Sequence, residues 1–182
     1  MLSLKFTIYE DVHMKSSKNT AHKIVIAALI AALCTVATMI IKVPSPMGGY
    51  VNIGDAVVLI AGWMLSPVYA FLAAAVGSAL ADVFAGYIVY VPATFLIKGI
   101  MALVAFFLVR AVGKRMENLV SKIISGVVAE IIMIGGYLVF EGFMYGFASA
   151  LANVPANSVQ GAVSLVLGVL LAKVFEKTKI QF

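Results

Sequence analysis

The chain has 182 residues, of which 63% are hydrophobic and only 12% are charged, and its mean hydropathy is +1.10. This composition excludes a water-soluble globular domain and indicates an integral membrane protein. The net charge of +5 does not indicate nucleic-acid binding, because the basic residues lie beside the ends of hydrophobic runs, where they set the orientation of a membrane protein.

The hydrophobic runs have the length of membrane helices and lack the ten-residue alternation of lipid-facing strands. We therefore expect an all-α integral membrane protein with a single membrane domain, residues 23–175. A cytoplasmic N-terminal tail, residues 1–22, is expected before it and a cytoplasmic C-terminal tail, residues 176–182, after it.

The first predicted span, residues 24–41, contains four alanines in two overlapping small-xxx-small pairs: Ala27, Ala28, Ala31 and Ala32. Such pairs let the backbone of another helix approach closely in lipid, so this face is a candidate docking surface. Because alanine is common in any membrane helix, ordinary helix composition is the alternative.

A loop rich in Pro and Gly is expected at residues 42–55, and the next 26 residues, 56–81, are charge-free. This run forms either one span or two short helices joined at Ser66 and Pro67. A single span would leave Arg110, Lys114 and Arg115 on the outer side. Two helices place these bases inside, in agreement with the positive-inside rule, and are therefore the prediction.

The remaining spans are predicted at residues 92–109, 119–140 and 155–174. The chain is then a bundle of six transmembrane helices with both the N terminus and the C terminus in the cytoplasm. Of the 13 Lys and Arg residues, all except Lys42 and Lys98 fall on the cytoplasmic side, which supports six spans.

Two charges at membrane depth, Asp82 and Lys98, flank a predicted loop and helix start. An unpaired charge there costs several kcal/mol, so the two side chains are expected to form a structural ion pair between the third and fourth spans. A ligand contact by Lys98 is the alternative. Tyr87 and Tyr90, on the loop, either stack on a ligand or belong to an aromatic belt at the membrane interface.

Polar side chains also share helical faces in the last two spans. Tyr137 and Glu141 lie one turn apart, and Asn157 and Gln160 form a second stripe. Together with the loops they predict an outward-opening cavity for a small molecule. Solvation of Glu141 at a helix end, and hydrogen bonds between helices for the two amides, are the alternatives, and Glu130 is assigned no ligand role.

Motifs for other chemistry are missing from the sequence. It contains no G-x-x-x-x-G-K-[ST] phosphate loop, no H-E-x-x-H and no G-x-S-x-G, so we expect neither an ATPase motif nor an enzyme. The lone Cys34 excludes a disulfide framework, and His13 and His22 are predicted on the cytoplasmic side. We therefore expect no metal site.

Four stretches in this order resemble the substrate-binding S components of energy-coupling factor (ECF) vitamin transporters: GGYVNIGDAVVLIAG, GSALADVFAGYIVYVPATFLIKGIMA, GGYLVFEG and NVPANSVQG. The resemblance is strongest to the riboflavin-type branch, which also contains hydroxymethylpyrimidine and pyridoxine carriers. It extends over residues 27–171.

The resemblance implies a six-helix subunit of the bacterial cell membrane that captures a vitamin from outside. It also implies docking, through the small residues of the first helix, onto a transmembrane coupling protein driven by two ABC ATPases, which use ATP while this chain binds no cofactor. The family's pocket maps onto nine positions of this sequence: Tyr50, Asn52, Tyr87, Tyr90, Lys98, Tyr137, Glu141, Asn157 and Gln160.

Tyrosine rings beside a carboxylate and amides suit a neutral or weakly basic hydroxymethyl heterocycle, so hydroxymethylpyrimidine or pyridoxine is the predicted substrate. Riboflavin or another vitamin is the alternative, whereas an acidic vitamin would need more outward-facing base than Lys42 and Lys98. A stand-alone secondary carrier and a small intramembrane enzyme are alternatives of another class.

Overall fold

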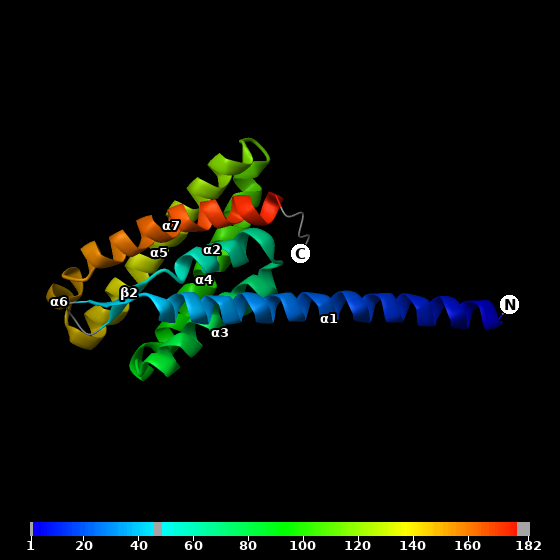
Figure 1. Cartoon of the computed structure of the whole chain (residues 1–182), viewed down its shortest axis with the longest axis horizontal. Helices are drawn as coiled ribbons and strands as arrows, with labels where there is room; N and C mark the ends of the chain where they lie inside the picture. The colour runs from blue at the N-terminus through cyan, green and yellow to red at the C-terminus, as the bar shows by residue number, and fades with distance from the viewer. Residues whose placement is uncertain (1, 46–48, 178–182) are drawn as a thin grey trace.

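The computed structural model describes the backbone of residues 2–45 and 49–177, with side chains described from Thr20 onward. In chain order the elements are α1 (Leu2–Ile40), β1 (Lys42–Pro44), β2 (Tyr50–Asn52), α2 (Asp55–Met64), α3 (Pro67–Ala85), η1 (Ile88–Tyr90), α4 (Val91–Gly113), α5 (Asn118–Tyr145), α6 (Phe147–Leu151) and α7 (Val154–Lys177) (Figure 1). The predicted tails fall largely outside the described side chains, so their location stays a prediction.

Five stretches of the described chain are helical, apolar and long enough to cross a bilayer: residues 20–40, 67–85, 88–113, 118–145 and 147–177. The prediction of an all-α membrane bundle is confirmed. Two details differ from the expectation. The loop at residues 42–55 contains an antiparallel hairpin, in which Lys42 lies opposite Asn52 and Pro44 opposite Tyr50. The second predicted helix, α2, has only 10 residues and a length of about 15 Å, which is too short to cross a hydrocarbon core of about 30 Å.

The predicted break at Ser66 and Pro67 is present between α2 and α3. Leu65 and Ser66 have extended ψ angles of 165° and 158°, and Pro67 lies at the start of α3. Proline disfavours helical geometry in the residue before it, while its own fixed φ suits the first helical turn. The chain therefore turns back here, and the charge-free run becomes two helices.

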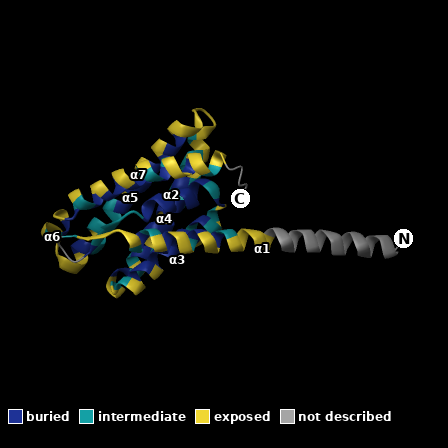
Figure 2. Ribbon diagram, viewed as in Figure 1, coloured by how far each residue is buried: buried dark blue, intermediate teal, exposed yellow. Residues whose placement is uncertain are grey.

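The short helix α2 lies at the centre of the bundle, where Figure 2 shows it almost entirely in the colour of buried residues. Val58, Leu59 and Ile60 have no exposed surface. Gly62 allows α4 to approach closely, because a Cβ at this position would lie 2.6 Å from the carbonyl oxygen of Ala102. The helix α2 is thus surrounded by the other helices of the bundle, so it does not have to span the bilayer.

The helices α1 and α3 also approach each other closely at a glycine. A Cβ at Gly77 of α3 would lie 2.5 Å from the carbonyl oxygen of Ala31, and Ala27 is buried on the same stripe of α1. Ala28 and Ala32 are exposed. The prediction that all four alanines face a partner protein is therefore wrong for Ala27 and Ala31, because the close helix approach that they permit is already made within the chain.

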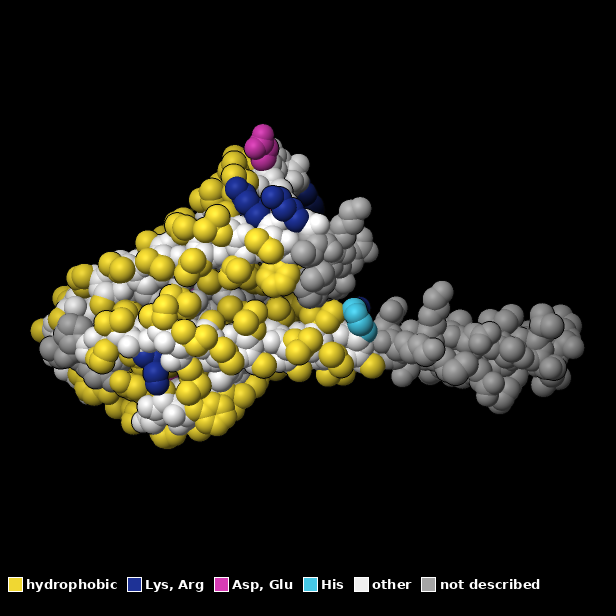
Figure 3. All heavy atoms as spheres, viewed as in Figure 1, with side chains coloured by type: hydrophobic (Ala, Val, Ile, Leu, Met, Phe, Trp, Pro, Cys, Tyr) yellow, Lys and Arg dark blue, Asp and Glu magenta, His cyan; other side chains and the backbone are white. Residues whose placement is uncertain are grey.

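The two ends of the bundle differ in composition. The hairpin, η1 and α6 lie at one end, and the α4–α5 turn and the end of α7 lie at the other (Figure 1). On the face shown in Figure 3, hydrophobic side chains cover most of the bundle, and a group of Lys and Arg side chains lies where α5 begins and α7 ends. The polar cavity described next belongs to the hairpin end.

Candidate functional site

A cavity opens beneath the hairpin, between the end of α3, the start of α4, the end of α5 and the start of α7. The space between its atoms, including the open mouth, amounts to about 480 Å³. Its lining is predominantly polar: Thr38, Ser45, Gly49, Tyr50, Asn52, Ser78, Asp82, Tyr90, Thr94, Lys98, Tyr137, Glu141, Asn157 and Gln160. Eight of the nine predicted pocket residues are in this set, and Tyr87 is the exception.

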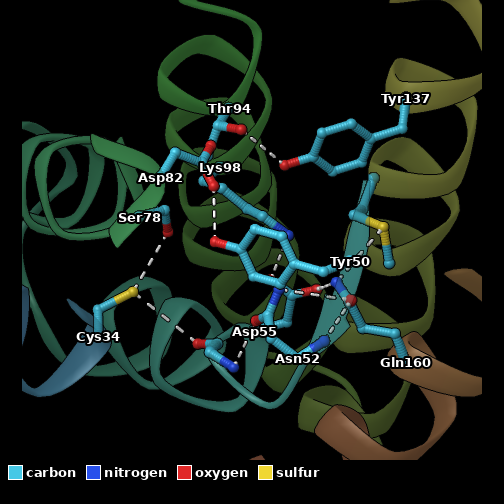
Figure 4. Close-up of polar contacts among 12 residues, drawn as sticks. Cys34, Tyr50, Asn52, Asp55, Ser78, Asp82, Thr94, Lys98, Tyr137 and Gln160 are labelled. Carbon is cyan, nitrogen blue, oxygen red and sulfur yellow. Dashed lines mark hydrogen bonds and ion pairs between the residues drawn. The ribbon is translucent and has the colours of Figure 1, made fainter. Parts of the chain in front are cut away.

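The floor of the cavity is a hydrogen-bonded network around Asp55, the first residue of α2 (Figure 4). One carboxylate oxygen accepts a charge-assisted bond from the Lys98 ammonium, and the other accepts from Gln160 Nε2 at 2.6 Å. Gln160 Oε1 in turn accepts from the backbone N–H of Asn52 at 2.8 Å. The network therefore connects the hairpin, α2, α4 and α7, and it satisfies both oxygens of a fully buried carboxylate.

The predicted ion pair between Asp82 and Lys98 is replaced by the pair between Asp55 and Lys98. The reason is geometric. The buried start of α2 places its acid directly against the Lys98 ammonium, whereas Asp82 accepts a hydrogen bond from the hydroxyl of Tyr50 at 2.6 Å. The second oxygen of Asp82, Oδ2, is buried and has no hydrogen-bond partner among the described residues, although the side chain lines the cavity.

Tyr50 stands outside the membrane-spanning helices, on β2, and its pKa is raised well above the usual range of a phenol. Burial is the main cause, and the hydrogen bond to Asp82 adds to it. The phenol therefore remains protonated and continues to donate to the Asp82 carboxylate at neutral pH. Because side chains alternate along a strand, Tyr50 and Asn52 both point to the cavity side of the hairpin.

Aromatic rings form one wall of the cavity. The ring centroids of Tyr90 and Tyr137 are 6.4 Å apart, and the Lys98 ammonium lies 5.2 Å from the centroid of Tyr137. Tyr87 does not line the cavity but packs against Tyr50, with ring centroids 4.7 Å apart and ring planes tilted by 50°. Its predicted ligand contact is therefore replaced by a supporting contact. The hydroxyls of Thr94 and Tyr137 are hydrogen-bonded at 3.0 Å, which joins α4 to α5 at this wall.

Glu141 lies next to this wall, one turn of α5 beyond Tyr137, and is buried rather than solvated at a helix end, because α5 continues to Tyr145. One oxygen accepts from Asn153 Nδ2 at 2.9 Å, and the other accepts from the Tyr90 hydroxyl at 3.4 Å. Asn157 lines the cavity one turn beyond Asn153. The carboxyl group is thus held in place by two neutral donors, and no cation lies within 4 Å of it among the described residues.

Glu130 lies apart from the lining residues. Its side chain is 5% exposed, it packs against Gly161, and neither of its oxygens has a hydrogen-bond partner among the described residues. Glu130 is not among the residues that line the cavity.

The sequence analysis did not identify Asp55, which holds the network beneath the cavity. It also did not identify three small polar residues of the lining, Thr38, Ser45 and Ser78. Asp55 was assigned to the end of a loop, where a carboxylate is normally solvated. The sequence does contain an indication that Asp55 pairs with Lys98. Asp55 directly precedes the charge-free residues 56–81, and Lys98 is a base at membrane depth that requires a buried partner.

This bundle of membrane helices with a polar cavity at one end defines an integral membrane protein that binds a small polar molecule. Its family follows from comparison with known sequences. The model of the family described as ECF-type riboflavin transporter, S component, matches residues 18–177. The chain belongs to this family. It is therefore a multi-pass protein of the cell membrane and the substrate-binding S component of a vitamin transporter, which is not an enzyme by itself.

Two curated proteins are similar to the chain in sequence. An uncharacterised protein of Pyrococcus woesei is 29% identical over 144 residues, which cover 79% of this chain and 94% of that protein. The thiamine precursor transporter HmpT of Lactococcus lactis is 42% identical over 50 residues, which cover 28% of this chain and 30% of HmpT.

Two solved structures share the fold. The S component of a bacterial ECF transporter superimposes with a TM-score of 0.67 at 19% identity, covering 89% of this chain and 99% of that one. The S component for biotin of an ECF-type ABC transporter superimposes with a TM-score of 0.59 at 15% identity, covering 86% and 93%. S components of this family act with a coupling protein and ATPases.

Proposed function

We propose that the chain captures hydroxymethylpyrimidine or pyridoxine in the cavity beneath the hairpin. The choice of substrate depends on one observation: the cavity is lined by more acidic groups than unpaired basic groups. Asp82 and Glu141 both line it, and Lys98, the base among the lining residues, is already paired with Asp55. The site is therefore a poor receptor for a carboxylate and a good receptor for ring N–H, amino and hydroxyl donors.

The geometry of the remaining groups supports the same class of molecule. Tyr90 and Tyr137 offer rings for stacking on a flat heterocycle, and the Asn157 and Gln160 amides face the same space. The local similarity to the thiamine precursor transporter HmpT adds support for a pyrimidine. Riboflavin is the second candidate, because it appears in the description of the matching family.

The cavity opens to the outside of the cell in this proposal. Lys114 and Arg115 lie on the α4–α5 turn, at the end of the bundle opposite the hairpin. Basic turns face the cytoplasm in most membrane proteins, so the hairpin end faces outward. Release then occurs through a transmembrane coupling protein and two ABC ATPases, which dock on the exposed side of α1, including Ala28 and Ala32.

Calorimetric titration of the full chain in detergent tests the substrate. Hydroxymethylpyrimidine, pyridoxine, riboflavin, biotin and pantothenate are compared at equal concentrations. We expect one of the first two to bind at least tenfold more tightly than the other three. Tight binding of riboflavin, biotin or pantothenate without competition from either heterocycle contradicts the proposal.

Uptake into liposomes tests the transport mechanism separately. With the coupling protein and both ATPases present, uptake is expected to require ATP. Uptake by this chain alone, driven by a proton or sodium gradient, contradicts the proposed mechanism and indicates a secondary carrier.

A further inference from the structure

A second cavity lies at the end of the bundle opposite the proposed vitamin site. It is bounded by α1, by the break between α2 and α3, and by the last turns of α4, and it contains about 670 Å³ of space between atoms, including its open side. Along α4, Lys98 of the first cavity and Arg110 of the second are about 18 Å apart, at a rise of about 1.5 Å per residue. The two cavities share no lining residue.

Arg110 is held in a defined orientation at the edge of this cavity. Its guanidinium carbon lies 3.6 Å from the ring centroid of Phe106. Its Nη1 donates to the carbonyl oxygen of Phe106 at 3.1 Å and to that of Gly62 at 3.5 Å. A guanidinium has five N–H donors, so the group is oriented by its neighbours while several donors remain available to an anion.

A second cation, Lys23 of α1, lines the same cavity together with the hydroxyl side chains of Ser66 and Tyr69. Among the described residues no carboxylate lies within 4 Å of Lys23 or Arg110. Two cations and two hydroxyls without a counter-ion form a suitable receptor for a phosphate oxyanion.

The other walls of the cavity are apolar and continue toward the lipid. Ile26, Met64 and Leu65 line its interior. Next along α3, Val68 is 65% exposed and Leu72 is 44% exposed, so an apolar path leads from the cavity along the outside of the bundle. A free inorganic anion would gain nothing from these contacts, whereas an acyl chain would bury apolar surface against them.

We propose that this cavity is a binding site for an anionic phospholipid, with the phosphate between Lys23 and Arg110 and an acyl chain along α3. This site is distinct from the vitamin site and does not depend on which vitamin the chain binds. Its position at the basic end of the bundle matches the membrane surface at which anionic headgroups gather around juxtamembrane Lys and Arg residues.

Native mass spectrometry of the full chain in detergent tests the proposal, with added dioleoylphosphatidylglycerol as the probe and dioleoylphosphatidylcholine as the neutral lipid with the same chains. The test variant carries Lys23→Gln and Arg110→Gln. The matched control carries Lys114→Gln and Arg115→Gln, which removes the same charge from the same end of the bundle but outside the cavity. Thermal unfolding in detergent checks that each variant is folded, and the two single substitutions replace the test variant if it is not.

We expect phosphatidylglycerol to bind the unmodified chain in preference to phosphatidylcholine. The test variant should bind phosphatidylglycerol about 25-fold more weakly, and each single substitution about fivefold more weakly, while the control pair changes binding less than twofold. An equal loss in both pairs contradicts the proposal and indicates diffuse surface charge. Displacement of the lipid by an equal concentration of inorganic phosphate contradicts the acyl-chain contact. Unchanged binding of phosphatidylglycerol to the folded test variant also contradicts the proposal.

Discussion

Asp55, at the first turn of α2, forms a buried ion pair with Lys98 of α4, although Asp82 is nearer to Lys98 in the sequence. The side chains of the pair are 1% and 4% exposed. A pair so deeply buried contributes more to defining one arrangement of helices than to net stability, because both ions lose their hydration.

The first prediction concerns this ion pair. Lys98→Met and Asp55→Asn should each lower the free energy of unfolding by about 3–5 kcal/mol, because each leaves a buried group without its partner. The double variant should lose clearly less than the sum. Denaturant unfolding in detergent measures all three. Combining Lys98→Met with Glu117→Gln, at the exposed start of α5, is the control, and there the two effects should add. Additive losses for Asp55 and Lys98 would contradict the pairing.

The second prediction concerns the uncompensated carboxylate of the cavity. Glu141→Gln should weaken binding of the heterocycle by about 10- to 100-fold, because it removes a charge-assisted hydrogen bond worth about 1.5–3 kcal/mol. Isothermal titration calorimetry measures the change. Glu117→Gln, at the exposed start of α5, serves as the control and should leave the affinity unchanged. An unchanged affinity for the Glu141 variant would show that this carboxylate only positions Asn153.

The third prediction concerns the outer face of α1. Ala28→Leu and Ala32→Leu should reduce co-purification of the coupling protein while vitamin affinity stays unchanged, because both residues are exposed and neither lines the cavity. Ala162→Leu, exposed on α7, is the matched control and should retain the partner. Ala27→Leu should instead lower thermal stability, since its side chain is buried. Full retention of the partner by both exposed variants would exclude this surface from docking.

The fourth prediction compares two helical glycines. Gly77→Ala should destabilise the protein by about 1–3 kcal/mol, because the new methyl group would lie 2.5 Å from the Ala31 carbonyl oxygen and would force α1 away from α3. Gly135→Ala meets no atom within 4 Å and should be neutral or stabilising by up to about 1 kcal/mol. Thermal unfolding in detergent distinguishes the two, and equal effects would contradict the close packing of α1 on α3.

The sequence was sufficient to predict the bundle and its principal break. Hydropathy locates helices without further information, and Pro67 cannot continue the helix that precedes it. The polar stripe of Asn157 and Gln160 could also be predicted, because the helical period alone places both amides on one face.

The rotation of α1 about its own axis and the depth of α2 in the bundle could not be predicted from the helical period. The alanine repeat of α1 occupies two adjacent stripes, and nothing in the spacing decides whether Ala27 and Ala31, or Ala28 and Ala32, face the bundle. The partner of Lys98 posed the same difficulty. Asp55 and Asp82 are both acids near the hairpin end of the bundle, and the depth at which the short helix α2 lies decides between them.

The enclosure of α2 has a consequence for how the protein responds to its bilayer. A membrane that becomes thinner or thicker acts on helices in contact with its acyl chains, which tilt or distort the surrounding lipid to relieve hydrophobic mismatch. Residues 55–63 of α2 are buried in protein, so this force does not act on them directly. While the five long helices adjust to a new thickness, α2 keeps its position through Asp55, and the floor of the vitamin cavity is preserved across membranes of different composition.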